Sequence, residues 1–494
     1  LKAGPKPPLA GTPSLRRMDG CGPSGMDGCC SMVHNPCLGR KPSTVTPEPL
    51  DSESLLYDDK DPNRTLARPL DSQDNRSVPG SPRREGFLPG PARACSLCCV
   101  GALLVAVVLE TALGAAAGRQ FVTLDSRVKE NVTDCPADLD GCGRREGYLR
   151  TPRNLTNLMW LPGCRGGRES ALFREMQTLN EKLDWKLVRF PSRKGSDSQE
   201  VVELTAWWLP AEDKAAPRVV VQHPIGVNFN DWSVQTMAYL LRSMGFAVLA
   251  PNLRDHGSSG PSGHRTVGWG WDYYLDTLGA WDFAVHDPRG ELGGKIDGKK
   301  VGLLGMSDGG FVASIAFAEE TTIPGIWLDS TVFDAEAQLE FQINRAIAHR
   351  LRPLEPAAPY LAPLFTDLSW LFAWGFSGVD LTRRTPESDL RGAPESATKR
   401  QVAVIHGFLD ESVPVSQSVA LVKMLKRTSD AYEVTEEYFP SECGPVNHVV
   451  SHLWGPNRYR SKLCSFFSQI FDTPGSRCGL GDLPSLEVEP KGSS

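Results

Sequence analysis

A short apolar run that ends in a glycine-flanked serine constrains this chain more than any other feature. It reads Val301-Gly-Leu-Leu-Gly-Met-Ser-Asp-Gly-Gly-Phe311, and a helix-compatible run follows it as far as Glu320. We expect a buried strand, a sharp turn at Ser307 and then a helix. Glycines suit positions 305 and 309 because a side chain there would collide with the adjoining strand or helix. Such a turn exposes the hydroxyl at the end of a sheet, beside the N–H groups of a helix N-terminus.

A histidine is needed next, because a serine hydroxyl is inert at neutral pH unless a base accepts its proton. In this architecture the nucleophile, the acid and the histidine follow one another along the chain. His448 follows the last expected strand, in a loop that reads Pro445-Val-Asn-His448, and we assign it as the base. His452 lies a few residues later and is the alternative.

The acid is best placed at Asp410, in the segment His406-Gly-Phe-Leu-Asp-Glu-Ser-Val-Pro414. The segment forms a turn after an expected strand, and its Val-Pro pair starts the next expected helix. A carboxylate there would fix the imidazole tautomer and stabilise the imidazolium. Glu411 is the alternative acid.

An oxyanion hole requires two N–H donors that face the developing negative charge. We expect one from the backbone of Asp308, directly after the serine. The other should come from the loop His223-Pro-Ile-Gly226, where Ile225 is our choice and Gly226 the alternative. Pro224 has no N–H and is excluded. The ring of His223 is expected to make structural hydrogen bonds.

From Leu183 onwards, short β-branched or aliphatic runs alternate with longer helical ones, which predicts an α/β fold with a mostly parallel sheet covered on both faces. The interval from Phe333 to Ala397 is too long for a simple connection, so we expect a small helical cap at about 333–397. A hairpin is expected from Trp185–Phe190 and Val201–Leu209. Later strands are expected at Arg218–Gln222, Ala247–Pro251, Val301–Gly305, Gly325–Asp329, Gln401–His406 and Tyr432–Phe439, and helices at Trp232–Ser243, Trp271–His286, Phe311–Glu320, Val415–Lys426 and Arg458–Phe471.

The N-terminal part has a different composition. Residues 1–93 are rich in Pro, Gly, Ser, Asp and Arg without periodicity, which predicts a disordered tail. Ala94 to Ala117 is the only long apolar run, interrupted by Glu110, and its length suffices for a transmembrane helix. We therefore expect a signal-anchor over 94–118, followed by a stalk over 119–182, the folded domain over 183–472 and a disordered tail over 473–494. A cleaved export signal that ends near Ala115-Ala-Ala-Gly118 is the alternative.

Cysteines and glycosylation sequons bear on the compartment. Six of the 13 cysteines follow Cys99, an even number that permits up to three disulfides; buried free thiols are the alternative. Glycosylation acceptors occur at Asn131 and Asn154. Both features favour a single-pass membrane protein of type II topology, with the folded domain in the lumen or outside the cell. The six cysteines are Cys135, Cys142, Cys164, Cys443, Cys464 and Cys478.

Charge and motifs exclude several classes of function. The chain has 53 basic and 59 acidic residues, so nothing suggests a nucleic-acid partner. It contains no HExxH motif, no Walker loop and no zinc-type CxxC pair with partners, and we expect neither a metal nor an organic cofactor. The oligomeric state does not follow from the sequence.

Several segments together resemble the α/β-hydrolase superfamily, from about Leu183 to Phe471. They read VVVQHPIG, VLAPNLRDHGSSG, VGLLGMSDGG, AVIHGFLDESVP and the late Asn447-His448 pair. The resemblance is closest to serine-aminopeptidase and prolyl-oligopeptidase-like members, and it implies a triad of Ser307, Asp410 and His448. One departure is the pair His223-Pro224, where the family usually has His-Gly; it implies a reshaped oxyanion loop.

We therefore expect a membrane-anchored serine hydrolase that transfers an acyl group to Ser307 and then to water. The substrate would be an ester, thioester or amide, with esterase or lipase-like action favoured. A serine peptidase of the same fold and a catalytically inactive binding protein are the alternatives. Seven apolar cap residues either line an acyl pocket or pack the cap onto the sheet; they are Leu339, Phe341, Leu361, Leu364, Phe365, Leu371 and Phe372.

Overall fold

The computed structural model describes nine stretches of the chain. The predicted N-terminal tail, the first part of the apolar run (94–110), nearly all of the predicted stalk and the end of the chain from residue 474 lie outside them. So do Asn131, Asn154 and five of the six late cysteines. The described stretches are 111–123, 186–195, 200–229, 231–264, 266–350, 352–393, 399–428, 431–440 and 446–473.

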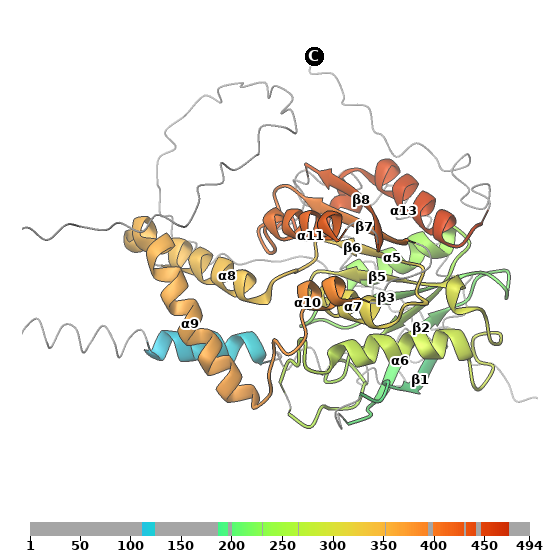
Figure 1. The fold of residues 1–494 in the computed structure, drawn as a ribbon, viewed down its shortest axis with the longest axis horizontal. Coiled ribbons are helices and arrows are strands. Elements are labelled where there is room, and N and C mark those ends of the chain that lie inside the picture. Colours follow the sequence, from blue (N-terminus) through green and yellow to red (C-terminus); the bar gives the residue numbers. More distant parts are fainter. Residues whose placement is uncertain are drawn as a thin grey trace, which may run out of the picture. The chain divides into compact units, whose positions relative to one another are not determined.

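Eight strands in the described part of the chain form one sheet, in the order β1-β2-β4-β3-β5-β6-β7-β8 (Figure 1). β1 and β2 are the predicted antiparallel hairpin, and β2 also runs antiparallel to β4. The other neighbours are parallel, so the carboxyl ends of β3 to β8 meet at one edge of the sheet. The strands are β1 Lys186–Pro191, β2 Glu203–Leu209, β3 Arg218–Gln222, β4 Ala247–Pro251, β5 Val301–Met306, β6 Gly325–Asp329, β7 Arg400–Gly407 and β8 Tyr432–Phe439.

Helices cover both faces of this sheet. Side chains alternate along each strand, so that Leu303 of β5 lies in one apolar cluster and Leu304 in the other. The first cluster also contains residues of α6 (Tyr273–His286), α7 (Asp308–Glu319) and α11 (Val415–Arg427). The second contains residues of α5 (Trp232–Ser243), α12 (Ser451–Trp454) and α13 (Pro456–Ile470). The prediction of a mostly parallel, two-sided α/β sheet is confirmed.

Three helices are inserted between β6 and β7, within the interval predicted to form a cap. They are α8 (Ala335–Arg350), α9 (Ala358–Ser377) and α10 (Pro386–Gly392). The described part of the chain also contains two short 3₁₀ segments, at Gly298–Lys300 before β5 and at Arg352–Ala357 before α9. Figure 1 shows α8 and α9 projecting away from the sheet, with the helix over residues 111–122 beside α9.

The expected bounds of α7 are wrong at its start. The sequence predicts a helix from Phe311, whereas α7 begins at Asp308. The first turn contains Gly309 and Gly310, which have low helix propensity and therefore indicate a loop. Gly309 is required there because a Cβ atom would lie 2.2 Å from the carbonyl oxygen of His223 on the neighbouring loop.

The apolar run near the N-terminus is described only from residue 111. None of the helices that the structure describes is long and apolar enough to cross a bilayer. Residues 111–122 are helical, and this helix packs closely against α9. A Cβ on Gly118 would lie 2.2 Å from the carbonyl oxygen of Ser369, and one on Gly114 would lie 2.9 Å from Cβ of Leu368. The described end of the predicted transmembrane segment is therefore in contact with protein.

One cysteine of the described chain bears on the disulfide expectation. Cys464 on α13 is fully buried and disulfide-bonded. The alternative of a free buried thiol is therefore wrong at this position. The other five cysteines after Cys99 lie outside the described residues.

Candidate active site

Ser307 lies in a strained turn between β5 and α7. Its backbone has φ 52° and ψ −129°, a region that residues other than glycine seldom adopt. Two backbone bonds hold the turn: the Ser307 N–H donates to the Asp329 carbonyl at 2.9 Å, and the Gly310 N–H donates to the Ser307 carbonyl at 2.9 Å. A Cβ on Gly305 would lie 2.7 Å from Cα of Gly310. The prediction that both flanking glycines are required by steric contact is confirmed.

Asp410 and His448 come together from the loops after β7 and β8. His448 Nδ1 lies 2.7 Å from Asp410 Oδ2, and the carboxylate can only accept, so Nδ1 carries the proton. The other oxygen, Oδ1, accepts the N–H groups of Ser412 at 2.8 Å and Val413 at 2.9 Å. The carboxylate is thereby fixed, and Nε2 of the imidazole keeps its lone pair.

The electrostatics of this pair follow from its burial and contacts. Burial alone would raise the pKa of Asp410, but the neighbouring His448 and His406 outweigh it and lower the pKa to about 2. For His448, burial would lower the pKa, but the Asp410 carboxylate, followed by Asp308 and Asp329, raises it above the usual 6.5. Asp410 is thus ionised at neutral pH and favours the imidazolium form of His448.

Asp308 links the serine to this pair. Its carboxyl group follows the serine directly and interacts electrostatically with His448. Burial raises the pKa of Asp308 to about 7, against the opposing effect of His448. The Ser307 hydroxyl makes no hydrogen bond to His448 in this structure, although both residues are described; such contacts are often long before substrate binds.

The two alternative residues occupy different surroundings. Glu411, next to Asp410, forms an ion pair with Arg345 on α8 at 2.6 Å and is partly exposed. His452 is 1% exposed, and its ring meets the edge of Tyr459, with centroids 5.7 Å apart. Burial lowers the pKa of His452 to about 3. Among these four groups, only Asp410 and His448 form a hydrogen-bonded acid–imidazole pair.

The candidate oxyanion loop follows β3 and is fixed by histidine contacts. The Gly226 N–H donates to His256 Nε2 at 3.2 Å, so it is already used. On the same ring, Nδ1 lies 2.7 Å from the Arg254 carbonyl, which assigns the proton to Nδ1. This arrangement favours Ile225 over Gly226 as the second donor. His223 makes the structural contacts expected of it, accepting the Leu253 N–H at 3.0 Å.

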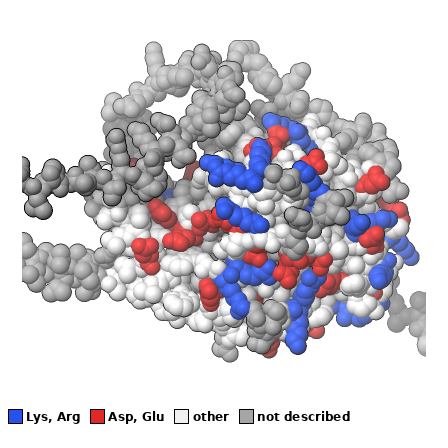
Figure 2. All heavy atoms as spheres, in the orientation of Figure 1, with Lys and Arg blue, Asp and Glu red and all other residues white. Residues whose placement is uncertain are grey.

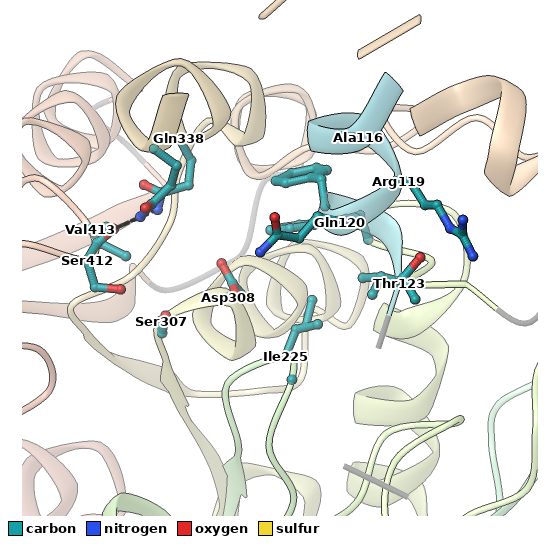
Figure 3. Close-up of a pocket in the computed structure, with 15 residues that line it drawn as sticks. Ala116, Arg119, Gln120, Thr123, Ile225, Ser307, Asp308, Gln338, Ser412 and Val413 are labelled. Atoms are coloured by element: carbon teal, nitrogen blue, oxygen red, sulfur yellow. Dashed lines mark hydrogen bonds between the residues drawn. The ribbon is translucent and has the colours of Figure 1, made fainter. Parts of the chain in front are cut away.

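A cavity of about 780 Å³ opens above the serine. Figure 3 shows Ser307, Asp308 and Ile225 on one side of it, Gln338 and Ser412 at one end, and Arg119 and Gln120 opposite. The lining is mixed. Its apolar members are Ala116, Phe121, Ile225, Gly226, Val267, Trp269 and Val413, and its polar ones are Arg119, Gln120, Thr123, Ser307, Asp308, Gln338, Gln342 and Ser412.

The apolar cap residues do not line this cavity, so that expectation is wrong. Leu339 packs in a separate cluster between α8 and α9, and Leu361 and Phe365 pack against the same cluster. Leu364 and Leu371 are half exposed on α9. Leu339, Leu361 and Phe365 pack α8 against α9 and not, as the alternative had it, the cap onto the sheet.

Two further groups at the site did not follow from the sequence. The helix over 111–122 forms one wall of the cavity; the ring of Phe121 stacks on Trp269 with centroids 4.9 Å apart. The sequence did not predict this contact, because the apolar composition of the segment indicated a transmembrane helix. Asp329, at the carboxyl end of β6, accepts a bond from Tyr459 Oη at 2.6 Å and raises the pKa of His448. Its position at the strand end, beside the serine strand, was a signal that could have identified it.

The described residues contain no group of three or more His, Cys, Asp or Glu side chains that could hold a metal ion. The site comprises a serine at a helix N-terminus, an acid–imidazole pair and a candidate oxyanion loop.

Comparison with known proteins yields matches only among solved structures. No family model and no curated protein matches the chain. An esterase from Pyrococcus furiosus is similar over 58% of this chain and 91% of its own, with 17% identity and a TM-score of 0.40. An acylaminoacyl peptidase from Pyrococcus horikoshii is similar over 59% and 41%, with 18% identity and a TM-score of 0.38. An α/β hydrolase from Penicillium is similar over 59% and 100%, with 13% identity and a TM-score of 0.40.

The chain's own architecture defines its fold class. The sheet is mostly parallel with β2 antiparallel, β3 lies between β4 and β5, and a strained serine joins β5 to α7. By this strand order and this junction, the chain has the fold of the α/β-hydrolase superfamily.

Proposed function

We propose that the protein is a serine hydrolase that cleaves an ester, thioester or amide through an acyl-enzyme on Ser307. The observation that carries the proposal is the 2.7 Å hydrogen bond between Asp410 and His448, on loops at the same sheet edge as the strained serine. A buried, ionised carboxylate that holds a neutral imidazole with Nε2 free is the arrangement that general-base activation of a serine requires.

The proposed mechanism has two acyl-transfer steps. His448 Nε2 accepts the Ser307 proton as Oγ attacks the carbonyl carbon, and the carbonyl electron pair moves to its oxygen. The N–H groups of Asp308 and Ile225 bind that oxyanion. The carbonyl re-forms as the leaving group departs with the proton from His448. Water then attacks the acyl-enzyme in the same way and releases the acid.

We favour a small-molecule ester as the substrate. A cavity of about 780 Å³ has the size of a small-molecule site. Phe121 and Trp269 contribute apolar surface to its lining, whereas Gln338 and Gln342 contribute polar amide groups, whose Nε2 atoms donate to the Ser412 carbonyl. This lining supports an ester with one apolar and one polar part. Matched ester and amide substrates with the same acyl group test the preference, and faster amide cleavage would favour a peptidase.

A fluorophosphonate probe tests whether the protein is an enzyme or an inactive binding protein. The probe should label the wild type, and Ser307→Ala should abolish the labelling. Ser330→Ala is a matched control, because Ser330 is also buried with a positive φ (51°), at the end of the neighbouring strand β6. Absence of labelling in the wild type, or equal labelling of Ser307→Ala, would refute the proposal.

Membrane attachment through the apolar run 94–118 and a lumenal or extracellular hydrolase domain stay proposals based on the sequence and on the Cys464 disulfide. In a secretory cell, glycosidase treatment should lower the mass of the protein if Asn131 or Asn154 is modified. An unchanged mass would argue against a lumenal domain.

A further inference from the structure

The helix α9 buries small residues completely and exposes large ones. Its fully buried residues are all small, Leu361, Phe365 and Trp370 are partly buried toward α8, and four large apolar side chains on another side of the helix are exposed. Tyr360, Leu364, Leu371 and Trp374 are 83%, 50%, 58% and 56% exposed. Spacings of four, seven and three residues put these four on one side of the helix. The buried residues are Ala358, Ala362, Thr366, Ser369, Ala373 and Ser377.

Water is a poor environment for this arrangement. A surface helix of a soluble domain normally turns its large apolar side chains toward the core and its polar ones outward. Small residues between helices with large apolar residues facing away are typical of helices in lipid, where close backbone contact replaces hydrophobic burial. Figure 2 shows the face over α9 and the helix over 111–122 mainly in white, with few charged side chains.

The helix over residues 111–122 also has an exposed apolar side chain. It packs on α9 through Gly114 and Gly118, and its Leu113 is 50% exposed. In the sequence, residues 100–109 precede Glu110 and this helix, and they contain no charged or strongly polar side chain. A lipid bilayer accounts both for the exposed apolar face of α9 and for the apolar composition of the sequence that precedes residue 111.

We propose that the outward face of α9 lies in the interfacial region of a lipid bilayer, with the helix parallel to the membrane. A parallel orientation is favoured because Asp367 lies on the outward face and none of the described helices is apolar enough to span. Tyr360 and Trp374, near the two ends of α9, have rings that partition to the level of the lipid headgroups.

The helix over 111–122 packs on α9 and also reaches the cavity. Leu113 near its start is exposed, and Phe121 near its end lines the cavity. An apolar group that leaves the bilayer along this helix would meet the cavity above Ser307. The membrane contact itself does not depend on catalysis, and it can be tested separately.

Flotation of the full-length chain with neutral phosphatidylcholine vesicles tests the proposal. Leu364→Ser/Leu371→Ser should lower the vesicle partition coefficient at least tenfold. Val201→Ser/Val419→Ser is the matched control, because these valines are 45% and 50% exposed elsewhere on the domain, and its partition should equal that of the wild type. Thermal melting, monitored by circular dichroism, checks that each variant is folded. Neither measurement requires the protein to be an enzyme.

Equal partition of the Leu364→Ser/Leu371→Ser variant and the wild type would overturn the proposal. That result is expected if residues 94–110 alone bind the vesicles, or if they cover α9. A second measurement is the quenching of tryptophan fluorescence by brominated phospholipids in the full-length chain. The quenched fraction should fall in Trp374→Leu, and an unchanged fraction would also overturn the proposal.

Discussion

Asp410 and Glu411 are adjacent carboxylates in opposite surroundings. Asp410 is buried and accepts two backbone N–H groups and the His448 ring, whereas Glu411 lies at the surface beside Arg345. Both residues carry a carboxylate, so it is the hydrogen bonds around Asp410 that allow it, and not Glu411, to orient the imidazole of His448. The pair therefore offers a variant and its control one residue apart.

Asp410→Asn should lower kcat for an ester about 10³–10⁴-fold, since the amide removes the charge that stabilises the imidazolium and permits the wrong tautomer. Glu411→Gln should change kcat less than about twofold, because it removes only a partly exposed ion pair. Steady-state kinetics of both purified variants provide the measurement. Equal losses in the two would contradict the assignment of the acid.

The pH dependence of kcat/KM should reveal the Asp308 charge. His448 must be neutral to act as a base, so activity falls as the pH drops through its pKa, which is raised partly by Asp308. Asp308→Asn removes that negative charge but keeps the backbone N–H. The acid limb should therefore move to lower pH, whereas in Glu411→Gln it should not move. An unmoved limb in Asp308→Asn would show that the two groups are not coupled.

At the scale of single residues, the sequence predicts those site residues that follow directly after parallel strands. Ser307, Asp410 and His448 each follow a strand, and the carboxyl ends of parallel strands share one edge. It could not decide between Ile225 and Gly226, because that depends on the bond from Gly226 to His256, a loop contact 30 residues away. Nor could it separate Asp410 from Glu411 with certainty, since Arg345 lies on a different element.

At the scale of elements, the sequence did not reveal the contact between α9 and the helix over 111–122. Small residues at 114 and 118 indicate close helix contact, but such a stretch equally suits a membrane helix. In contrast, β3 to β8 were located to within about one residue. β3 to β7 contain aliphatic runs that are buried on both faces, and β8 is a half-exposed run that contains aromatic and β-branched residues.

Gly118→Val should displace the helix over 111–122 from α9. Its side chain would meet the Ser369 backbone, and such overpacking typically costs about 1–3 kcal/mol. The wall that holds Phe121 would shift, so KM for an ester that fills the cavity should rise several-fold.

Gly375→Ala on α9 is the control for that change. No heavy atom lies within 4 Å of a Cβ built there, so the substitution meets open space. It should leave KM unchanged and slightly stabilise the helix, by about 0.5–1 kcal/mol. If KM rose in both Gly118→Val and Gly375→Ala, the effect would come from a change in α9 itself. That result would contradict the role proposed for the contact between α9 and the helix over 111–122.

The stability of the whole molecule toward acid depends on histidines that fold in the neutral form. Burial lowers the pKa of both His223 and His452 to about 3, well below their usual 6.5. Above pH 6.5 neither the folded nor the unfolded state binds these protons. As the pH falls from 6.5 toward 3, only the unfolded state takes them up, so folding stability is lost across that window. His448 acts in the opposite direction: because its pKa is raised, its contribution is present at low pH and lost as the pH rises through the folded value.

His452→Leu isolates this effect away from the acid–imidazole pair, since the ring lies in the core against Tyr459. Between pH 7.5 and 5.0, proton uptake by an unfolded histidine of pKa 6.5 should cost the wild type about 2 kcal/mol of stability. Urea denaturation at both pH values should therefore show a loss smaller by about that amount in the variant. His349→Leu is the control, because that histidine is exposed on α8 and the same substitution should leave the loss unchanged. An equal loss in His452→Leu and the wild type would mean that the folded protein binds the proton as readily as the unfolded chain, and that His452 is hydrated rather than buried.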